Sequence, residues 1–158
     1  MPQLATTRFT KDTWDENVAW RQSHNCINGC AYGTPKYICD NIEYDEVVYV
    51  LEMNNDINKI VGIGKIRNKI QLGIKKRDKK IYSDPFYCKY LYKGNRRIDR
   101  NELTEREVII INILELIVFY GGGHLKRGHG ITRMNPVILN RVKDIDLLEE
   151  IEYMFNRR

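Results

Sequence analysis

The chain has 158 residues, of which 42% are hydrophobic and 30% charged, and its formal net charge is +5. This length suits one domain and excludes two well-packed ones, and the composition differs from that of a disordered protein. No apolar run reaches the roughly 18 residues that a membrane-spanning helix needs. The first residues lack the charged and apolar regions of a secretion signal, and the four cysteines require no oxidising compartment. We therefore expect a single domain over residues 1–158 in an intracellular setting, cytoplasmic or nuclear.

Positive charge is concentrated in the middle of the chain. Residues 59–100 carry fourteen Lys and Arg against three Asp and Glu, whereas residues 1–58 have a net charge of −5 and residues 101–158 a net charge of −1. Such asymmetry indicates a face that binds polyanions, nucleic acid first and an anionic membrane surface second. The alternative is a solvated Lys-rich surface produced by a bias towards Lys, Asn and Ile, since the chain has 20 Ile and 14 Asn.

The N-terminal part predicts a short helix followed by a loop. Thr13 and Glu16 have the spacing of a capping box, in which each side chain bonds an amide at the start of a helix. We expect this helix to run to about Ser23. Residues 25–35 contain the turn formers Asn and Gly and end in a proline, so they indicate an irregular loop.

Five strands are expected in the middle of the chain. The run 47–53 is apolar on both faces until Glu52 and predicts a central strand. Apolar residues alternate with others in three further segments, which gives strands over 60–66, 70–74 and 86–92, and residues 96–100 would add the fifth.

The C-terminal part predicts two helices. Thr104 and Glu107 form a second capping box before an apolar helix that ends at Tyr120, and Asn135-Pro136 starts a last helix that runs to Phe155. The element order predicts an α+β fold with a mostly antiparallel, barrel-like sheet of about five strands, an N-terminal helix and two C-terminal helices.

A basic glycine-rich segment separates these two helices. Residues 121–133 hold five glycines, three Lys and Arg, two histidines and no acid. Glycines let backbone amides approach a phosphate, and Lys and Arg add charge-assisted hydrogen bonds. The segment follows a helix and matches neither a Walker loop nor a dinucleotide fingerprint. We favour phosphate contact over the alternative of a helix cap followed by a flexible loop.

Aromatic residues are interleaved with the basic ones between residues 79 and 100. Bases stack on tyrosine faces while cations follow the phosphates, so this composition is typical of a surface that binds single strands. Alternation in a strand assigns one set of these aromatics to the core in any case. Only Tyr87 and its neighbours on the same strand face are therefore candidates.

Metal binding and catalysis find little support in the sequence. His24, Cys26, Cys30 and Cys39 are zinc-ligand types, but their spacing does not match a structural zinc site, and buried reduced cysteines are the default. Neither the Gly-x-Ser-x-Gly motif of serine hydrolases nor the His-Glu-x-x-His motif of zinc proteases is present. We expect no metal, no cofactor and no enzyme activity. The alternative is a small enzyme that uses His124 or His129.

Several segments resemble the PUA-like superfamily, which includes the YTH, EVE and ASCH domains, with YTH the nearest. Arg8-Phe9-Thr10 precedes the first helix, and Tyr32-Gly33-Thr34-Pro35 stands where YTH domains place a Trp before a small residue and Ser or Thr. An apolar run with an Asn-containing turn over 47–55 and a Gly-containing strand over 60–66 are similar to their strand pair. The resemblance covers residues 8–120 as a PUA-like core, and residues 121–158 add the Gly-rich basic loop and a C-terminal helix. Methyl-adenine readers of this group use tryptophans in their cage, whereas no Trp follows Trp20 here. The Ile, Asn and Lys bias would suit a large DNA virus or another AT-rich genome.

We therefore expect a non-catalytic domain that binds RNA in preference to DNA and reads a splayed or modified base. A groove between the sheet and the Gly-rich loop would hold phosphates through Lys89, Lys93, Arg96, Arg97, Arg100, Gly121, Gly122, Gly123, His124, Lys126, Arg127, His129 and Arg133. The base pocket would be formed by Tyr32, Thr34 and Tyr87. The alternative is a protein-binding or assembly component that uses the basic face and the last helix. No membrane partner is expected.

Overall fold

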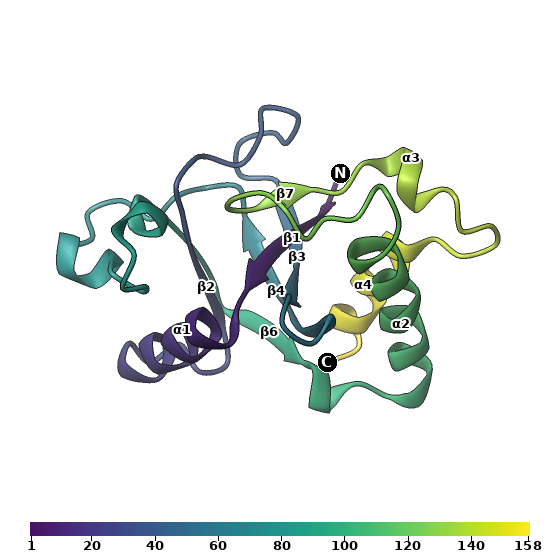
Figure 1. The fold of residues 1–158 in the computed structure, drawn as a ribbon, viewed down its shortest axis with the longest axis horizontal. Helices are drawn as coiled ribbons and strands as arrows, with labels where there is room; N and C mark the ends of the chain where they lie inside the picture. The colour runs from purple at the N-terminus through teal and green to yellow at the C-terminus, as the bar shows by residue number, and fades with distance from the viewer.

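The main sheet has five strands in the order β6-β4-β3-β1-β7, in a computed structural model that describes residues 1–158 (Figure 1). A separate pair of antiparallel strands, β2 (Cys30–Thr34) and β5 (Tyr90–Gly94), lies beside it. The strands of the main sheet are β1 (Gln3–Phe9), β3 (Val47–Asn54), β4 (Lys59–Arg67), β6 (Arg96–Asp99) and β7 (Thr132–Arg133).

The main sheet is mixed and does not close into a barrel. β1 pairs with β3 in parallel, from Gln3 opposite Val48 to Phe9 opposite Asn54, while the other neighbours are antiparallel. The predicted α+β class and the mostly antiparallel pairing are therefore confirmed, since β1-β3 is the one parallel pair, and the predicted barrel-like closure is wrong. A parallel pair needs a long connection, which α1, β2 and the following loop provide here.

Two of the five expected strands and one expected loop differ from the prediction. Residues 70–74 form no strand, and residues 86–92 are divided between the 3₁₀ helix η2 (Pro85–Cys88) and β5. Ile70 and Ile74 still pack against the core, so their alternation reflects burial without strand pairing. The expected loop over 25–35 contains the buried strand β2. The strands predicted over 47–53, 60–66 and 96–100 are confirmed as β3, β4 and β6.

The longer helices begin at capping residues. α1 (Lys11–Ser23) starts from a box formed by Thr10 and Thr13, three residues before the expected one. α2 (Glu105–Phe119) starts from the predicted box of Thr104 and Glu107. The predicted last helix is interrupted, giving α3 (Pro136–Leu139) and α4 (Leu147–Asn156), because Asp144 has a positive φ of 68° and Asp146 caps a new helix. The other 3₁₀ helices are η1 (Lys76–Lys79) and η3 (Arg100–Glu102).

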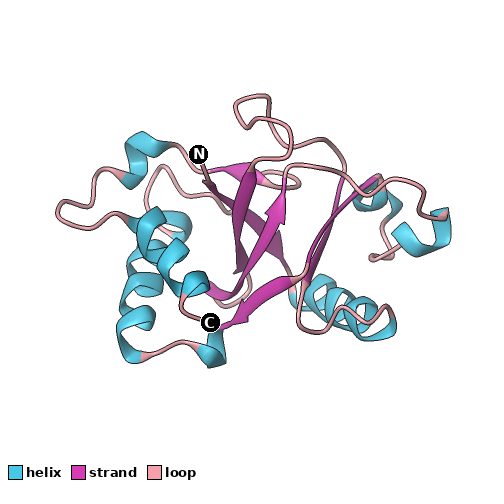
Figure 2. Cartoon of the chain, turned by 180° about the vertical axis from the view of Figure 1, so that it is seen from behind, coloured by secondary structure: helices cyan, strands magenta, loops and turns pink.

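Two apolar cores flank the main sheet. One face packs against α2 and α4 through Leu51, Ile111, Leu114, Ile151 and Phe155. The other face packs against α1 and the β2-β5 pair through Val48, Val50, Trp20, Tyr32 and Leu91. Figure 2 shows the sheet between these two groups of elements. None of the helices has the length and hydrophobicity that crossing a membrane requires.

Candidate functional site

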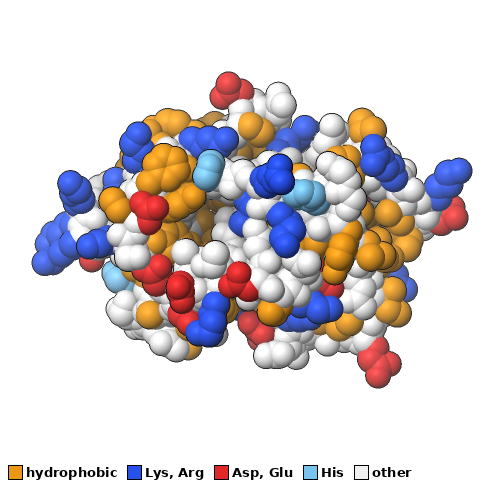
Figure 3. Space-filling view, viewed as in Figure 1, with side chains coloured by type: hydrophobic (Ala, Val, Ile, Leu, Met, Phe, Trp, Pro, Cys, Tyr) orange, Lys and Arg blue, Asp and Glu red, His pale blue; other side chains and the backbone are white.

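A cavity of about 260 Å³ lies where β1 and β3 end. Arg8 and Phe9 of β1 form one side, Gly33 of β2 and Tyr87 of η2 another, and the loop around Lys126 covers it. No Asp or Glu lines the cavity. Figure 3 shows the hollow on this face, with hydrophobic side chains on one side and Lys, Arg and His side chains close by.

Arg8 attaches the Gly-rich loop to the sheet. Its guanidinium donates hydrogen bonds to the carbonyl oxygens of Leu125 (3.2 Å) and Gly130 (2.6 Å) and to the hydroxyl of Thr132 (2.9 Å). Burial lowers the pKa of Arg8, because desolvation disfavours the charged form. All its partners are neutral oxygens, so its charge is not balanced by a carboxylate.

Asn55 makes a second attachment between the sheet and the loop. Its amide nitrogen donates a hydrogen bond to the carbonyl oxygen of Lys126 at 2.9 Å. The other amide atom, Asn55 Oδ1, is buried without a partner, and so is Arg8 Nε. Buried polar groups normally find partners, so the two atoms are unusual, and both belong to residues that line this cavity.

The loop needs glycine where it meets β2. Gly130 has a positive φ of 71°, and a Cβ atom there would lie 3.3 Å from Thr34 Cβ. Such a backbone conformation suits glycine and strains other residues. The glycines at 128 and 130 therefore let the loop fold back over the cavity.

Aromatic side chains form the edge of the cavity. The hydroxyl of Tyr87 lies 2.9 Å from His129 Nδ1, and Phe86 meets the His129 ring edge-on at 5.7 Å between centroids. Phe86 is exposed. Of the two histidines that a small enzyme would use, His129 contacts this edge through Tyr87. His124 instead accepts a hydrogen bond from the backbone amide of Lys126 and does not line the cavity.

Only one of the three residues predicted for the base pocket lines the cavity. Tyr87 does so, whereas Tyr32 is 1% exposed and donates a hydrogen bond to Glu52 at 2.7 Å. Thr34 is also buried and donates a hydrogen bond to the carbonyl oxygen of Lys36. We correct the prediction for both residues: alternation along β2 turns them inward, and the backbone at Gly33 reaches the cavity.

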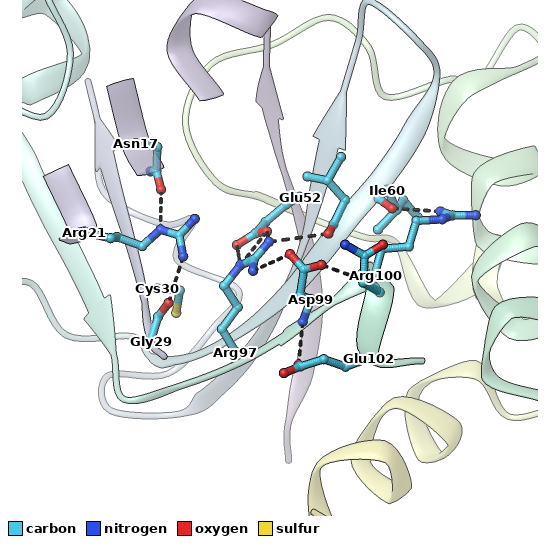
Figure 4. A network of polar contacts seen from close by, with 12 residues as sticks. Asn17, Arg21, Gly29, Cys30, Glu52, Ile60, Arg97, Asp99, Arg100 and Glu102 are labelled. Atoms are coloured by element: carbon cyan, nitrogen blue, oxygen red, sulfur yellow. Dashed lines mark hydrogen bonds and ion pairs between the residues drawn. The ribbon is translucent and has the colours of Figure 1, made fainter. Parts of the chain in front are cut away.

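Two of the predicted phosphate contacts are structural ion pairs, and Figure 4 shows those of Arg97. Arg97 forms a bidentate pair with Glu52 and a further pair with Asp99, and its side chain is 6% exposed. Arg100 pairs with Glu115 at 2.9 Å. The assignment of Arg97 and Arg100 to phosphate binding is corrected, because carboxylates already occupy both guanidinium groups.

The remaining predicted cations do not meet in one groove. Lys93 and Arg96 line a second hollow near Val47, at the start of β3, whereas Lys126 lines the cavity beyond Asn54, at its end. An extended strand of this length spans about 23 Å. Lys89 and Arg127 are exposed, and Arg133 donates a hydrogen bond to Gln3 Oε1 from β7. The single groove that was expected is therefore not formed.

The glycines at the end of α2 do not shape either hollow. Gly121, Gly122 and Gly123 are exposed, and a Cβ atom at any of them would contact nothing within 4 Å. They form the exposed turn that follows the helix.

The potential zinc ligands are dispersed. Cys26 and Cys30 are buried and Cys39 is exposed, while His24 stacks on Trp20 at 4.1 Å between ring centroids. No group of three or more His, Cys, Asp or Glu side chains is placed to hold a metal ion. Burial, together with the charge of Glu52, raises the pKa of Cys30 to about 12.

Arg8, Asn55 and a basic run were missed from the sequence. The run consists of Lys65, Arg67 and Lys69. The spacing by two places Lys65 and Arg67 on one face of β4, and Lys69 follows just after the strand, so the sequence does carry a signal for this run. Arg8 carried no such signal, because only the tertiary structure brings Leu125 and Gly130 to its side chain.

Comparisons of the chain with protein-family models, with curated proteins and with solved structures found no match. The PUA-like resemblance therefore stays a prediction.

Proposed function

We propose that the chain binds single-stranded RNA and inserts one base into the cavity beside Arg8 and Tyr87. The observation that carries the proposal is the combination of an aromatic edge with a guanidinium that has no carboxylate partner. Bases splayed out of a strand stack on aromatic side chains and use their polar edges for hydrogen bonds. A volume of about 260 Å³ suits one flat ring system rather than a larger ligand.

Two polar side chains beside the cavity suit contacts to a base. Arg8 Nε is a donor and Asn55 Oδ1 is an acceptor for an exocyclic amino group, and because both atoms are shielded in the free protein, insertion of the base has to turn them towards it. Lys126 also lines the cavity, and no acid does, so an adjacent phosphate meets no repulsion.

The test measures binding of labelled single-stranded RNA, matched single-stranded DNA and duplex RNA by fluorescence anisotropy. Tyr87→Ala removes the stacking surface, which contributes about 1–3 kcal/mol per base, so affinity for single strands should fall roughly 5- to 150-fold. Tyr87→Phe keeps the ring and should bind nearly as tightly as the wild type. Tyr153→Ala removes an exposed tyrosine on α4 and serves as the matched control. Equal affinities of Tyr87→Ala and the control would exclude base insertion at this cavity.

A protein partner is the second candidate, and an exposed apolar stripe on α2 favours it. Ile109, Leu116 and Tyr120 are exposed along or just after this helix. The last helix, expected to be the docking element, instead buries Leu147 and Ile151 of α4 in the core. Absence of RNA binding at low salt would favour this candidate.

A further inference from the structure

A second hollow, which we call the basic groove, is lined by Lys65, Arg67, Lys69, Lys93 and Arg96. Its volume is about 490 Å³, and none of its ten lining residues is Asp or Glu. It lies at the end of β3 opposite to the base cavity.

Close packing between the two sheets brings these cations together. A Cβ atom at Gly94 would collide with the carbonyl oxygen of Lys65, so the end of β5 lies directly against β4. Beyond the end of β4, the amide of Gln71 donates a hydrogen bond to the carbonyl oxygen of Leu91 in β5 at 2.8 Å. Cations from segments about 25 residues apart in the sequence therefore face one groove.

The charges of the groove are largely uncompensated. Lys69 and Lys93 form no ion pair, and Lys65 Nζ lies over the ring of Tyr49, 5.8 Å from its centroid. Arg96 donates to the backbone carbonyl oxygen of Phe155. The one carboxylate paired with a lining residue is that of Asp45, at 3.9 Å from Arg67 Nη1 on the surface. Cations that line one hollow repel one another, and a bound polyanion removes that repulsion.

We propose that the basic groove binds consecutive phosphodiester groups of the RNA strand, a contact that rests on the function proposed above. Lys and Arg at such a site hold the backbone without reading its sequence. Only Val47 and Ile66 supply apolar lining, so the groove lacks the aromatic and aliphatic anchors of a protein interface. The groove would therefore provide affinity, and the cavity about 23 Å away along β3 would provide base preference.

The test compares the salt dependence of RNA binding between two double variants. Lys69→Gln/Lys93→Gln neutralises the two cations that have no ion pair, and Arg141→Gln/Lys143→Gln makes the same charge change in the exposed loop after α3. For single strands each phosphate contact contributes about 0.7 to the slope of log K against log salt, so the groove variant should lose about 1.4. At 0.1 M salt this corresponds to roughly 25-fold weaker binding.

The outcomes separate the groove from the cavity. If the groove variant binds RNA with the same salt slope as its control, the basic groove does not bind phosphates, whatever Tyr87→Ala shows. A lowered slope in the groove variant, with no effect of Tyr87→Ala, supports the groove and contradicts base insertion. A wild-type protein that binds no RNA at low salt overturns both proposals. As a second measurement, the backbone amides of Gly94 and Asn95 should shift in NMR spectra when RNA is added, and unchanged signals would contradict the groove.

Discussion

Arg97 and Glu52 form a bidentate ion pair across β4, with Arg97 Nη2 at 2.6 Å from Glu52 Oε2 and Nε at 3.0 Å from Oε1. The pair passes over Gly62, where any Cβ atom would collide with the guanidinium of Arg97. Tyr32 of β2 donates a hydrogen bond to the same carboxylate, so this network joins the small sheet to the large one. It thereby holds the strands that frame both the cavity and the groove.

Loss of Arg97 should destabilise the protein strongly. Arg97→Gln leaves Glu52 buried without its partner, and removing one member of a buried pair costs about 3–5 kcal/mol. Urea unfolding followed by circular dichroism measures the loss, with Lys143→Gln as the exposed control. A loss of less than about 0.5 kcal/mol in the free energy of unfolding would show that the pair is not buried as described.

Glycine at position 94 should be required by the packing of β5 on β4. Gly94→Ala places a Cβ atom against the carbonyl oxygen of Lys65, which forces the strands apart and costs about 1–3 kcal/mol. Gly122→Ala is the matched control, because a Cβ atom there meets nothing. Its unfolding free energy should stay within about 1 kcal/mol of the wild type or rise slightly. Equal effects in thermal unfolding would contradict the contact between the sheets.

Local signals explain which elements the sequence predicts well. Thr104 and Glu107 lie three residues apart, and the capping box they form depends only on its own helix, so α2 was predicted almost to the residue. The run 47–53 is apolar enough to indicate a central strand in any sheet. The missed strand β2 is short and lies between Gly29 and Pro35, so its strand state depends on pairing with β5, about 60 residues away.

The candidate site was predicted only in part, because it too depends on contacts between residues that are distant in the sequence. Tyr87 was identified because aromatic and basic residues alternate around it in the sequence. Arg97 and Lys93 look alike in that pattern, yet one is buried against Glu52 and the other lines the basic groove. The burial that separates them comes from β3, which is distant in the sequence.

Glu107 should make stability fall in acid. Burial raises its pKa, but hydrogen bonds from Arg158 and from the amide of Thr104, with the charges of Arg158 and Arg157, leave the pKa below its ordinary value. A lowered folded-state pKa adds stability that is complete above the unfolded value of about 4.3 and is lost as pH falls towards the folded one. Glu107→Gln should therefore lose about 1–3 kcal/mol at pH 7 and show a flatter acid limb below about pH 5.

Glu105→Gln provides the control for this experiment, because Glu105 is exposed in the same first turn of α2. Urea unfolding at several pH values compares the two variants. An acid limb in Glu107→Gln as steep as that of the control would contradict the role of this carboxylate.

The cysteines should react in the order of their exposure. Cys39 is exposed, whereas Cys26 and Cys30 are buried, and burial raises the pKa of both thiols. Because the thiolate is the reactive form, iodoacetamide at pH 8 should label Cys39 first and Cys30 only after unfolding. Peptide mass spectrometry measures the order. Labelling of Cys30 at the rate of Cys39 in the native protein would contradict its position in the core.

Arg8 should control how firmly the Gly-rich loop covers the cavity. Arg8→Lys keeps the positive charge but loses the planar group that reaches Leu125, Gly130 and Thr132 together. Trypsin cleavage after Lys126 or Arg127 should then become roughly tenfold faster, because the loop opens without these hydrogen bonds. Arg106→Lys changes an exposed arginine paired with Glu150 and should leave the cleavage rate unchanged. Equal cleavage rates in the two variants would show that the loop is held by Asn55 and its own backbone rather than by Arg8.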